Sequence, residues 1–422
     1  MNWMIFGALI ITVGAIAALI KRYETRLVLI AAGLLMCCLS LQPMAALNQF
    51  AKSMTQSSLI MAICSALGFA AVISATKCDV HLVTMLTRPL KKLGVAVLPA
   101  CMVICGIVAV AVPSGAGLVA AVGPTVIPIL LKAGFKPATA CAAVWASLIP
   151  AYYNPGVSHN VFLAKMAGME VMPFIELSIV PILILSLISI VSVTITAVVF
   201  GDYQKGVDQS LESGNEAAPQ LERVNPIYAV VPLLPVVLLV LGNTCVPGLK
   251  MGVAQAMVIG AIVALAVTRT DPQSASKTFF NGMGKGYGNI LGIIIAAGVF
   301  AAGLRACGVV DLFVGYLTQA NEIARFGALI GPFLLGAITG SGDAAAFAFN
   351  EAVTPHAAEF GLTVPGLGMM AVLSAALGRQ LSPLAGGLIL STGFANGVNP
   401  LEVTKRTAPA AIVMLIATYF LY

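Results

Sequence analysis

Charged residues are scarce in this sequence. Only 9% of its 422 residues are charged, whereas 59% are hydrophobic. Soluble proteins have about a quarter of their residues charged, so a sizeable soluble domain is excluded. Apolar runs of about 20 residues, the length of a membrane-spanning helix, follow one another from the N-terminus to Tyr422. The sequence therefore predicts an all-α polytopic membrane protein.

Groups that support catalysis or metal binding are also sparse. The chain has three histidines, and its nine cysteines lack metal-ligand spacing accompanied by histidine. No nucleophile with a neighbouring base and no Walker-type phosphate loop is visible. We therefore expect no enzyme activity, no cofactor, no metal site and no self-contained ATP drive. The basic residues cluster in short loops, which indicates membrane orientation and argues against a nucleic-acid partner.

Loop charges predict the orientation of the first helices. Lys21, Arg22 and Arg26 follow the apolar run from Trp3 to Ile20. A cleavable signal peptide instead carries its positive charge before the apolar run. We therefore expect a retained first helix, with the N-terminus outside and the first connection cytoplasmic. Further helices are expected at about 27–46, 57–76, 95–113, 174–200, 227–246 and 250–268, with 47–56 as a connection.

Two apolar regions are interrupted by glycine, proline and polar residues. Short segments broken in this way are typical of re-entrant hairpins and discontinuous transmembrane helices. The interruptions are PSGAG (113–117), GPTVIP (123–128), LKAGFKP (131–137), IPAYYNPGVSHN (149–160), AITGSGDAA (337–345) and the proline break at 382–383.

The two broken regions match each other along the chain. The matched positions, at an offset of 227 residues with a one-residue slip in the last two pairs, are Ser114 with Ser341, Gly115 with Gly342, Pro128 with Pro355, Gly134 with Gly361, Asn154 with Ser382 and Pro155 with Pro383. The basic connection from Lys77 to Lys92 has the less positive segment from Arg305 to Arg325 as its partner, as expected if the second half is inverted.

The matching regions divide the chain into five parts. These are N-terminal transmembrane helices (1–56), a first inverted repeat (57–200), a hydrophilic acidic linker (201–226), connecting helices (227–286) and a second inverted repeat (287–422). In secondary transporters with inverted repeats, the substrate site lies between broken helices near the middle of the membrane. We expect the same location here.

The breaks supply the candidate substrate site. Broken helices expose backbone N–H groups at their N-termini, and these groups, with hydroxyl and amide side chains, can bind carboxylate oxygens. Close helix packing is the alternative role of the small residues. The candidate substrate-binding residues are Ser114, Gly115, Asn154, Pro155, Thr339, Ser341, Gly342, Arg379, Ser382 and Pro383.

Asp343 is the candidate ion-coupling residue. A carboxylate is costly in hydrocarbon, so it should face a protein-lined cavity, where it could meet Na⁺ or carry a proton. Arg379 is the only Lys or Arg between Arg325 and Lys405. Its guanidinium could grip a substrate carboxylate with two hydrogen bonds, or it could pair with Asp343. Both roles stay open at this point.

Two stretches carry a family resemblance. VAVPSGAGLVAAVGPTVIPILLKAG and ITGSGDAAAFAFNEAVTPHA resemble the DcuC family of anaerobic C4-dicarboxylate transporters. The resemblance implies transport of succinate, fumarate or malate across the bacterial inner membrane by a multi-pass protein with inverted repeats, hairpins and an elevator-like movement. It also implies that Ser114, Gly115, Ser341 and Gly342 lie at hairpins or broken helices near the substrate.

The expected function is secondary active transport of a small carboxylate, by exchange or by symport with Na⁺ or H⁺ as the coupling ion. A carrier of another small anion, a tricarboxylate or an amino acid would share these features. A channel would need a continuous pore, and a membrane enzyme would need a nucleophile or a metal cluster. The expected partners are the carboxylate and the lipid bilayer, and a homodimer is left open.

Overall fold

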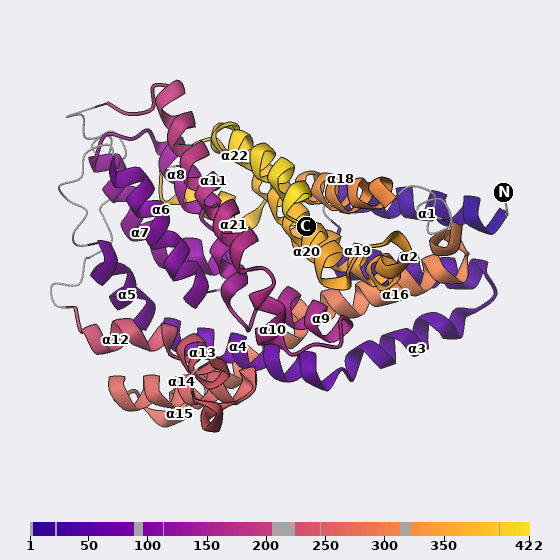
Figure 1. Ribbon diagram of the computed structural model, residues 1–422, viewed down its shortest axis with the longest axis horizontal. Coiled ribbons are helices and arrows are strands. Elements are labelled where there is room, and N and C mark those ends of the chain that lie inside the picture. Colours follow the sequence, from indigo (N-terminus) through magenta and orange to yellow (C-terminus); the bar gives the residue numbers. More distant parts are fainter. Residues whose placement is uncertain are drawn as a thin grey trace.

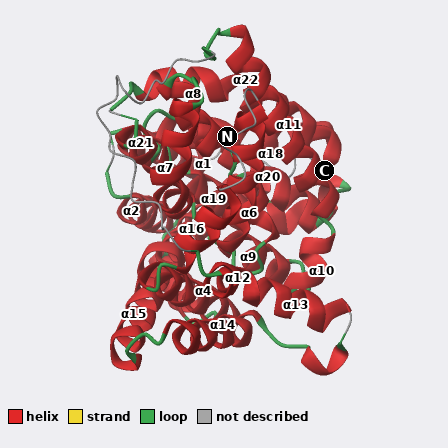
Figure 2. Cartoon of the chain, turned by 90° about the vertical axis from the view of Figure 1, so that its left-hand side faces the viewer, coloured by secondary structure: helices red, strands yellow, loops and turns green. Residues whose placement is uncertain are grey.

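Every regular element in the described part of the chain is a helix (Figure 2). The computed structural model describes residues 3–21, 23–87, 96–112, 114–204, 224–244, 246–312, 321–395 and 397–422. In these ranges the single isolated β-bridge joins Phe135 to Tyr203. The prediction of an all-α protein is confirmed. The predicted loop residues Arg22, Arg88, Lys91 and Lys92, the break residue Pro113 and most of the acidic linker (205–223) lie outside the described residues.

The N-terminal helices differ from the prediction at one point. They are α1 (Trp3–Ile20), α2 (Thr25–Leu39), α3 (Pro43–Met54), α4 (Ser57–Ala75) and α5 (Cys78–Thr87). The expected single helix at 27–46 and the expected connection at 47–56 are wrong. The chain turns at Leu41, which has a φ of 58°, and Pro43 then starts α3, a position where its missing N–H costs nothing.

The described residues of the first broken region and its flanks form seven helical segments. They are α6 (Val97–Ala111), α7 (Gly115–Lys132), α8 (Pro137–Ala146), η3 (Ile149–Tyr153), α9 (Ser158–Met166), α10 (Val171–Glu176) and α11 (Ile179–Val199). The predicted interruption at 123–128 is wrong, because Pro124 and Pro128 lie inside the continuous helix α7. Prolines are tolerated in membrane helices when neighbouring groups satisfy the backbone that they free.

The connecting region lies along one edge of the molecule beside α4 (Figure 1). It comprises α12 (Pro226–Val230), η4 (Val231–Leu233), α13 (Leu234–Thr244), η5 (Pro247–Leu249), α14 (Val253–Thr268) and α15 (Pro272–Lys285). A π-helical turn, η6 (Gly286–Leu291), joins α15 to α16 (Gly292–Ala306). The expected helix at 227–246 is therefore divided into shorter segments.

The second broken region forms the C-terminal part of the chain. It contains α18 (Asn321–Thr339), α19 (Gly342–Ala352), η7 (Thr354–Phe360), α20 (Val364–Leu381), α21 (Gly386–Gly393) and α22 (Pro400–Leu421). Figure 1 shows α9, α19 and α20 between α5–α8 at one end of the long axis and α1, α2 and α16 at the other.

Four helical stretches among the described residues are long and apolar enough to cross a membrane. They are α4, α7, α11 and the run from α15 to α16. One face of α11 exposes large apolar side chains at four-residue spacing, at Leu183, Leu187, Val191 and Ile195. Positions four residues apart share a helix face, so this stripe suits contact with lipid.

Glycines let α18 and α20 cross closely. A Cβ atom on Gly378 would lie 2.0 Å from the carbonyl oxygen of Phe333, and one on Gly336 would lie 2.4 Å from that of Ala375. Small residues allow this approach of membrane helices. The contact fixes α18, which leads into the break before α19, against α20.

A buried carboxylate ties three elements together. Asp202, just after α11, has no exposed side-chain surface and accepts hydrogen bonds from Arg406 Nε at 2.6 Å and Thr139 Oγ1 at 2.7 Å. Lys136 Nζ lies 3.0 Å from its other oxygen. Burial alone would raise the pKa of Asp202, but the hydrogen bonds from Arg406, Thr139 and Lys136 outweigh burial and lower it. The ionised form therefore stabilises the junction of α8, α11 and α22.

We expect Asp202→Ala to destabilise the protein by about 3–5 kcal/mol, because it leaves Arg406 buried without its main partner. Thermal unfolding in detergent at pH 7 would measure the loss, and Glu402→Gln, which changes the more exposed partner of Arg406, should cost much less. Because the folded-state pKa is lowered, the contribution is complete above the ordinary value of about 4 and is lost as the pH falls below it. A wild-type protein and an Asp202→Ala variant with the same unfolding temperature at pH 7 would contradict this assignment.

Candidate functional site

A cavity of about 350 Å³ lies where the breaks of the two halves meet. This volume is within the usual range of small-molecule sites, about 300–1,000 Å³. The cavity is bordered by the start of α7, the segment from α8 to α9, the break between α18 and α19, and the break between α20 and α21. The predicted site residues that line it are Ser114, Gly115, Ser341, Gly342, Asp343 and Arg379.

Helix N-termini converge on this cavity. The first residues of α7, α9, α19 and α21 all line it, namely Gly115, Ser158, Gly342 and Gly386. The first turn of a helix leaves backbone N–H groups without intrahelical partners and carries a partial positive charge. Four such ends around one cavity form a favourable environment for an anion.

Local sequence explains the break between α18 and α19. Gly340 has a φ of 71°, a backbone conformation that suits glycine. The Thr339 hydroxyl donates to the carbonyl oxygen of Leu335 at 2.6 Å and accepts from the Ser341 N–H at 3.2 Å. In the matching break, Ser114 accepts from the N–H of Gly117 at 3.3 Å and caps α7. The Ser341 hydroxyl makes no such capping bond.

Three ionisable side chains meet at the cavity. The Nε2 atom of His159 lies 3.0 Å from Asp343 Oδ1, within hydrogen-bonding distance. The Arg379 guanidinium lies 3.7 Å from the same oxygen. The His159 ring also stacks on Phe347 of α19, with 4.3 Å between ring centroids. Asp343 is therefore held between α9 and α20 rather than facing hydrocarbon.

Trp145 of α8 joins helix ends from the two halves. Its ring lies under the Arg379 guanidinium, with 5.8 Å from Cζ to the ring centroid, a cation–π distance. A Cβ atom on Gly387 would lie 2.3 Å from this ring, and one on Gly115 would lie 3.4 Å from it. Glycine at position 387 is thus required for the indole to fit against the start of α21.

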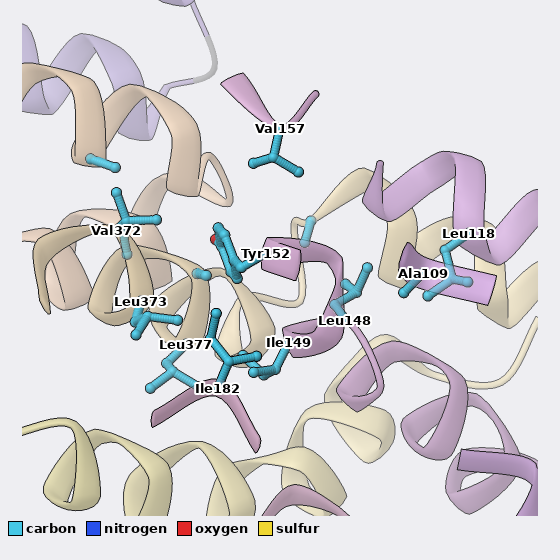
Figure 3. Packing of buried hydrophobic residues seen from close by; sticks show 14 of the residues in the cluster. Ala109, Leu118, Leu148, Ile149, Tyr152, Val157, Ile182, Val372, Leu373 and Leu377 are labelled. Carbon is cyan, nitrogen blue, oxygen red and sulfur yellow. The ribbon is translucent and has the colours of Figure 1, made fainter. Parts of the chain in front are cut away.

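The floor of the cavity is apolar. Leu148, Ile149 and Tyr152 of the segment around η3 line it and are buried in the core. Figure 3 shows Tyr152 with Val372 and the other labelled α20 side chains on one side and Leu148 on the other. This packing fixes the segment between α8 and α9 that contains η3, so the N-terminus of α9 is held at the cavity.

Five predicted residues are not among those that line the cavity. These residues are Asn154, Pro155, Thr339, Ser382 and Pro383. Asn154 is buried, donates to the carbonyl oxygen of Val110 at 2.6 Å and accepts from the Gly156 N–H at 2.7 Å. The Ser382 hydroxyl is buried and accepts from the N–H of Leu384 at 3.4 Å. In this arrangement Asn154 and Ser382 stabilise the backbone at the breaks through hydrogen bonds and do not line the cavity.

Sequence reasoning left His159, Trp145, Tyr152 and Gln380 out of the predicted site, although all four line the cavity. His159 is one of three histidines in the chain, and Gln380 adjoins Arg379, so both carried a signal. Nothing in the sequence paired His159 with Asp343, 184 residues away. Among the described residues no group of three or more His, Cys, Asp and Glu side chains could hold a metal ion.

Comparison with curated proteins gives relatives in several bacteria. A putative uncharacterized transporter of Haemophilus influenzae is 49% identical over 277 residues, which cover 64% of this chain and 98% of that protein. The anaerobic C4-dicarboxylate transporter DcuC of Escherichia coli K12 is 25% identical over 374 residues, covering 85% of this chain and 78% of that protein.

Two solved structures share the fold at 14% sequence identity. The YdaH transporter of Alcanivorax borkumensis matches with a TM-score of 0.63, covering 89% of this chain and 86% of that one. MtrF of Neisseria gonorrhoeae, described as illuminating a class of antimetabolite efflux pumps, matches with a TM-score of 0.65, covering 89% and 82%.

The family assignment comes from the sequence itself. The model of the C4-dicarboxylate anaerobic carrier family, DcuC, matches residues 39–422. This match confirms the resemblance carried by the two broken regions, and the family and the curated relatives are transporters rather than enzymes. The chain therefore belongs to the DcuC family of C4-dicarboxylate anaerobic carriers and is a multi-pass membrane transporter.

Proposed function

We propose that this protein is a secondary transporter that moves a C4-dicarboxylate, such as succinate, fumarate or malate, across the bacterial inner membrane. The observation that carries the proposal is the convergence of four helix N-termini and Arg379 on one cavity. These groups supply positive charge for two carboxylates without a metal ion. The name of the DcuC relatives supports the choice of solute.

The substrate is bound in this proposal by the lining residues. Arg379 donates to one carboxylate, and the N–H groups at Gly115, Gly342 and Gly386 bind the other, assisted by the Ser114 and Ser341 hydroxyls. Asn154, Pro155, Thr339, Ser382 and Pro383 hold the breaks in shape. Transport of a different small anion or an amino acid, or flux through a channel, remains an outcome of the tests below.

We also propose that the segments 57–200 and 287–422 are inverted repeats flanked by the N-terminal helices (1–56), the acidic linker (201–226) and the connecting helices (227–286). The order of elements supports a repeat. In each half a serine N-cap precedes a helix that starts at the cavity, and a matched glycine with positive φ follows, Gly134 at 98° and Gly361 at 66°. An elevator-like movement of the broken helices against the connecting helices would then carry the substrate.

Counterflow in proteoliposomes tests the proposed solute. Vesicles loaded with unlabelled succinate should accumulate labelled succinate in a saturable manner, and fumarate and malate should compete. Non-saturable flux without counterflow would indicate a channel. Competition by a tricarboxylate or an amino acid, but not by fumarate or malate, would reject C4-dicarboxylates as substrates.

We expect Arg379→Gln to raise the KM for succinate about 10- to 100-fold, the loss of hydrogen bonds to a charged group. A matched control is Arg325→Gln, because the Arg325 guanidinium also lies over an aromatic ring, that of Tyr419 at 5.4 Å, but does not line the cavity. Similar KM values for the two variants would show that Arg379 does not bind the substrate.

Ser114→Ala and Ser341→Ala should each raise the KM about 2- to 10-fold, because each removes one hydroxyl from the cavity wall. Ser186→Ala serves as the control, since its hydroxyl only donates to the carbonyl oxygen of Ile182 within α11 at 2.6 Å. Saturation curves for the three variants at equal membrane insertion provide the measurement. Unchanged curves for both cavity variants would place the substrate elsewhere.

Asp343 is proposed to couple transport to Na⁺ or H⁺. Asp343→Asn keeps the shape and removes the charge, so it should abolish ion-driven accumulation while succinate exchange continues. If Asp343 only neutralises Arg379, the double variant Asp343→Asn/Arg379→Gln should recover much of what either single change loses. Glu359→Gln, which alters a carboxylate–histidine pair with His356 away from the cavity, is the control. An Asp343→Asn protein whose accumulation keeps its dependence on pH and Na⁺ would reject the coupling role.

A further inference from the structure

Buried polar atoms without partners gather around the cavity. Nε1 of Trp145, Nδ1 of His159, Nε of Arg379 and both amide atoms of Gln380 make no hydrogen bond within the described part of the chain. All four residues line the same cavity. Buried polar groups are nearly always hydrogen-bonded in proteins, so this concentration indicates groups that are satisfied by a ligand or by solvent.

Gln380 differs from the other three residues because it offers both a donor and an acceptor. Its side chain is 1% exposed, and neither Nε2 nor Oε1 has a partner among the described residues. The Thr407 hydroxyl donates to its backbone carbonyl oxygen at 3.1 Å and so fixes the last turn of α20 to α22. The backbone of Gln380 is therefore held in place beside Arg379, and the residue lines the cavity.

The chemistry of an amide selects its partner. A hydroxyl group donates and accepts, so it can pair with both the oxygen and the nitrogen of Gln380. A carboxylate only accepts, and a methylene group does neither. An arrangement built to bond a hydroxyl rejects the analogue that lacks it, because the buried polar groups then stay unpaired.

We propose that Gln380 is a specificity-determining residue that recognises a hydroxyl group on the carbon chain of the substrate. The preferred substrate class is then a 2-hydroxydicarboxylate, with malate favoured over succinate. This inference rests on the proposed transport of C4-dicarboxylates. In the proposed function Arg379 and the helix N-termini bind the two carboxylates. Gln380 would in addition recognise the hydroxyl group on the carbon chain between those carboxylates.

Competition in proteoliposomes containing the full chain tests this role. L-malate, D-malate and succinate are compared as inhibitors of labelled succinate exchange, since the two malates have the same charge and size. We expect one malate enantiomer to compete more strongly than succinate. In Gln380→Met that preference should fall about 3- to 10-fold, the value of one net hydrogen bond.

Two further variants keep the result interpretable. Gln380→Leu provides a second apolar replacement in case methionine perturbs packing, and removal of an unpaired polar group is expected to be nearly neutral for folding. Ser374→Ala is the control, since Ser374 is buried on the same helix with an unpartnered hydroxyl but does not line the cavity. Its malate preference should equal that of the wild type.

The outcomes separate the two proposals. If the wild type exchanges none of the three dicarboxylates, the proposed function fails. If the wild type exchanges them with no preference, or if the preference persists in both Gln380 variants, the role of Gln380 is overturned while dicarboxylate transport stands.

Discussion

A helix that begins inside a membrane protein leaves backbone N–H groups that hydrocarbon cannot satisfy. This constraint organises the present structure. α7, α9, α19 and α21 all begin at one cavity. Thr339, Asn154 and Ser382 satisfy part of the backbone at these breaks. N–H groups at helix starts favour a nearby anion. In the proposed function, the cost of breaking the helices and the capacity to bind a carboxylate would therefore have the same origin.

Charge balance in the cavity depends on Asp343. The carboxylate lies between Arg379 and His159, so the positive charge of the guanidinium is partly compensated when no anion is present. In the proposed function, a substrate with two carboxylates would compete with Asp343 for the Arg379 guanidinium. An ion or a proton that neutralises Asp343 would release Arg379 for the substrate, which gives a physical route from ion binding to substrate affinity.

The sequence allowed most of the helix breaks to be located, but it did not show which residues from other helices pack around them. Glycine, serine and proline act through local backbone geometry, and for that reason Ser114 and Ser341 could be placed at helix starts from their neighbours alone. The prolines of α7 misled the prediction, because their effect depends on packing that the sequence does not show. The bend at Leu41 carried no glycine signal. The His159–Asp343 contact and the place of Trp145 depend on tertiary structure, and no spacing rule could have linked residues so far apart.

The contact between Trp145 and Gly387 joins the two halves of the chain. The indole of the first half occupies the space that a side chain at position 387 of the second half would need. A larger residue at 387 is therefore acceptable only with a smaller one at 145, and each change alone is disfavoured. Related carriers that differ at one of these positions should differ at the other, so the halves, even if they arose by duplication, can no longer diverge independently at the cavity.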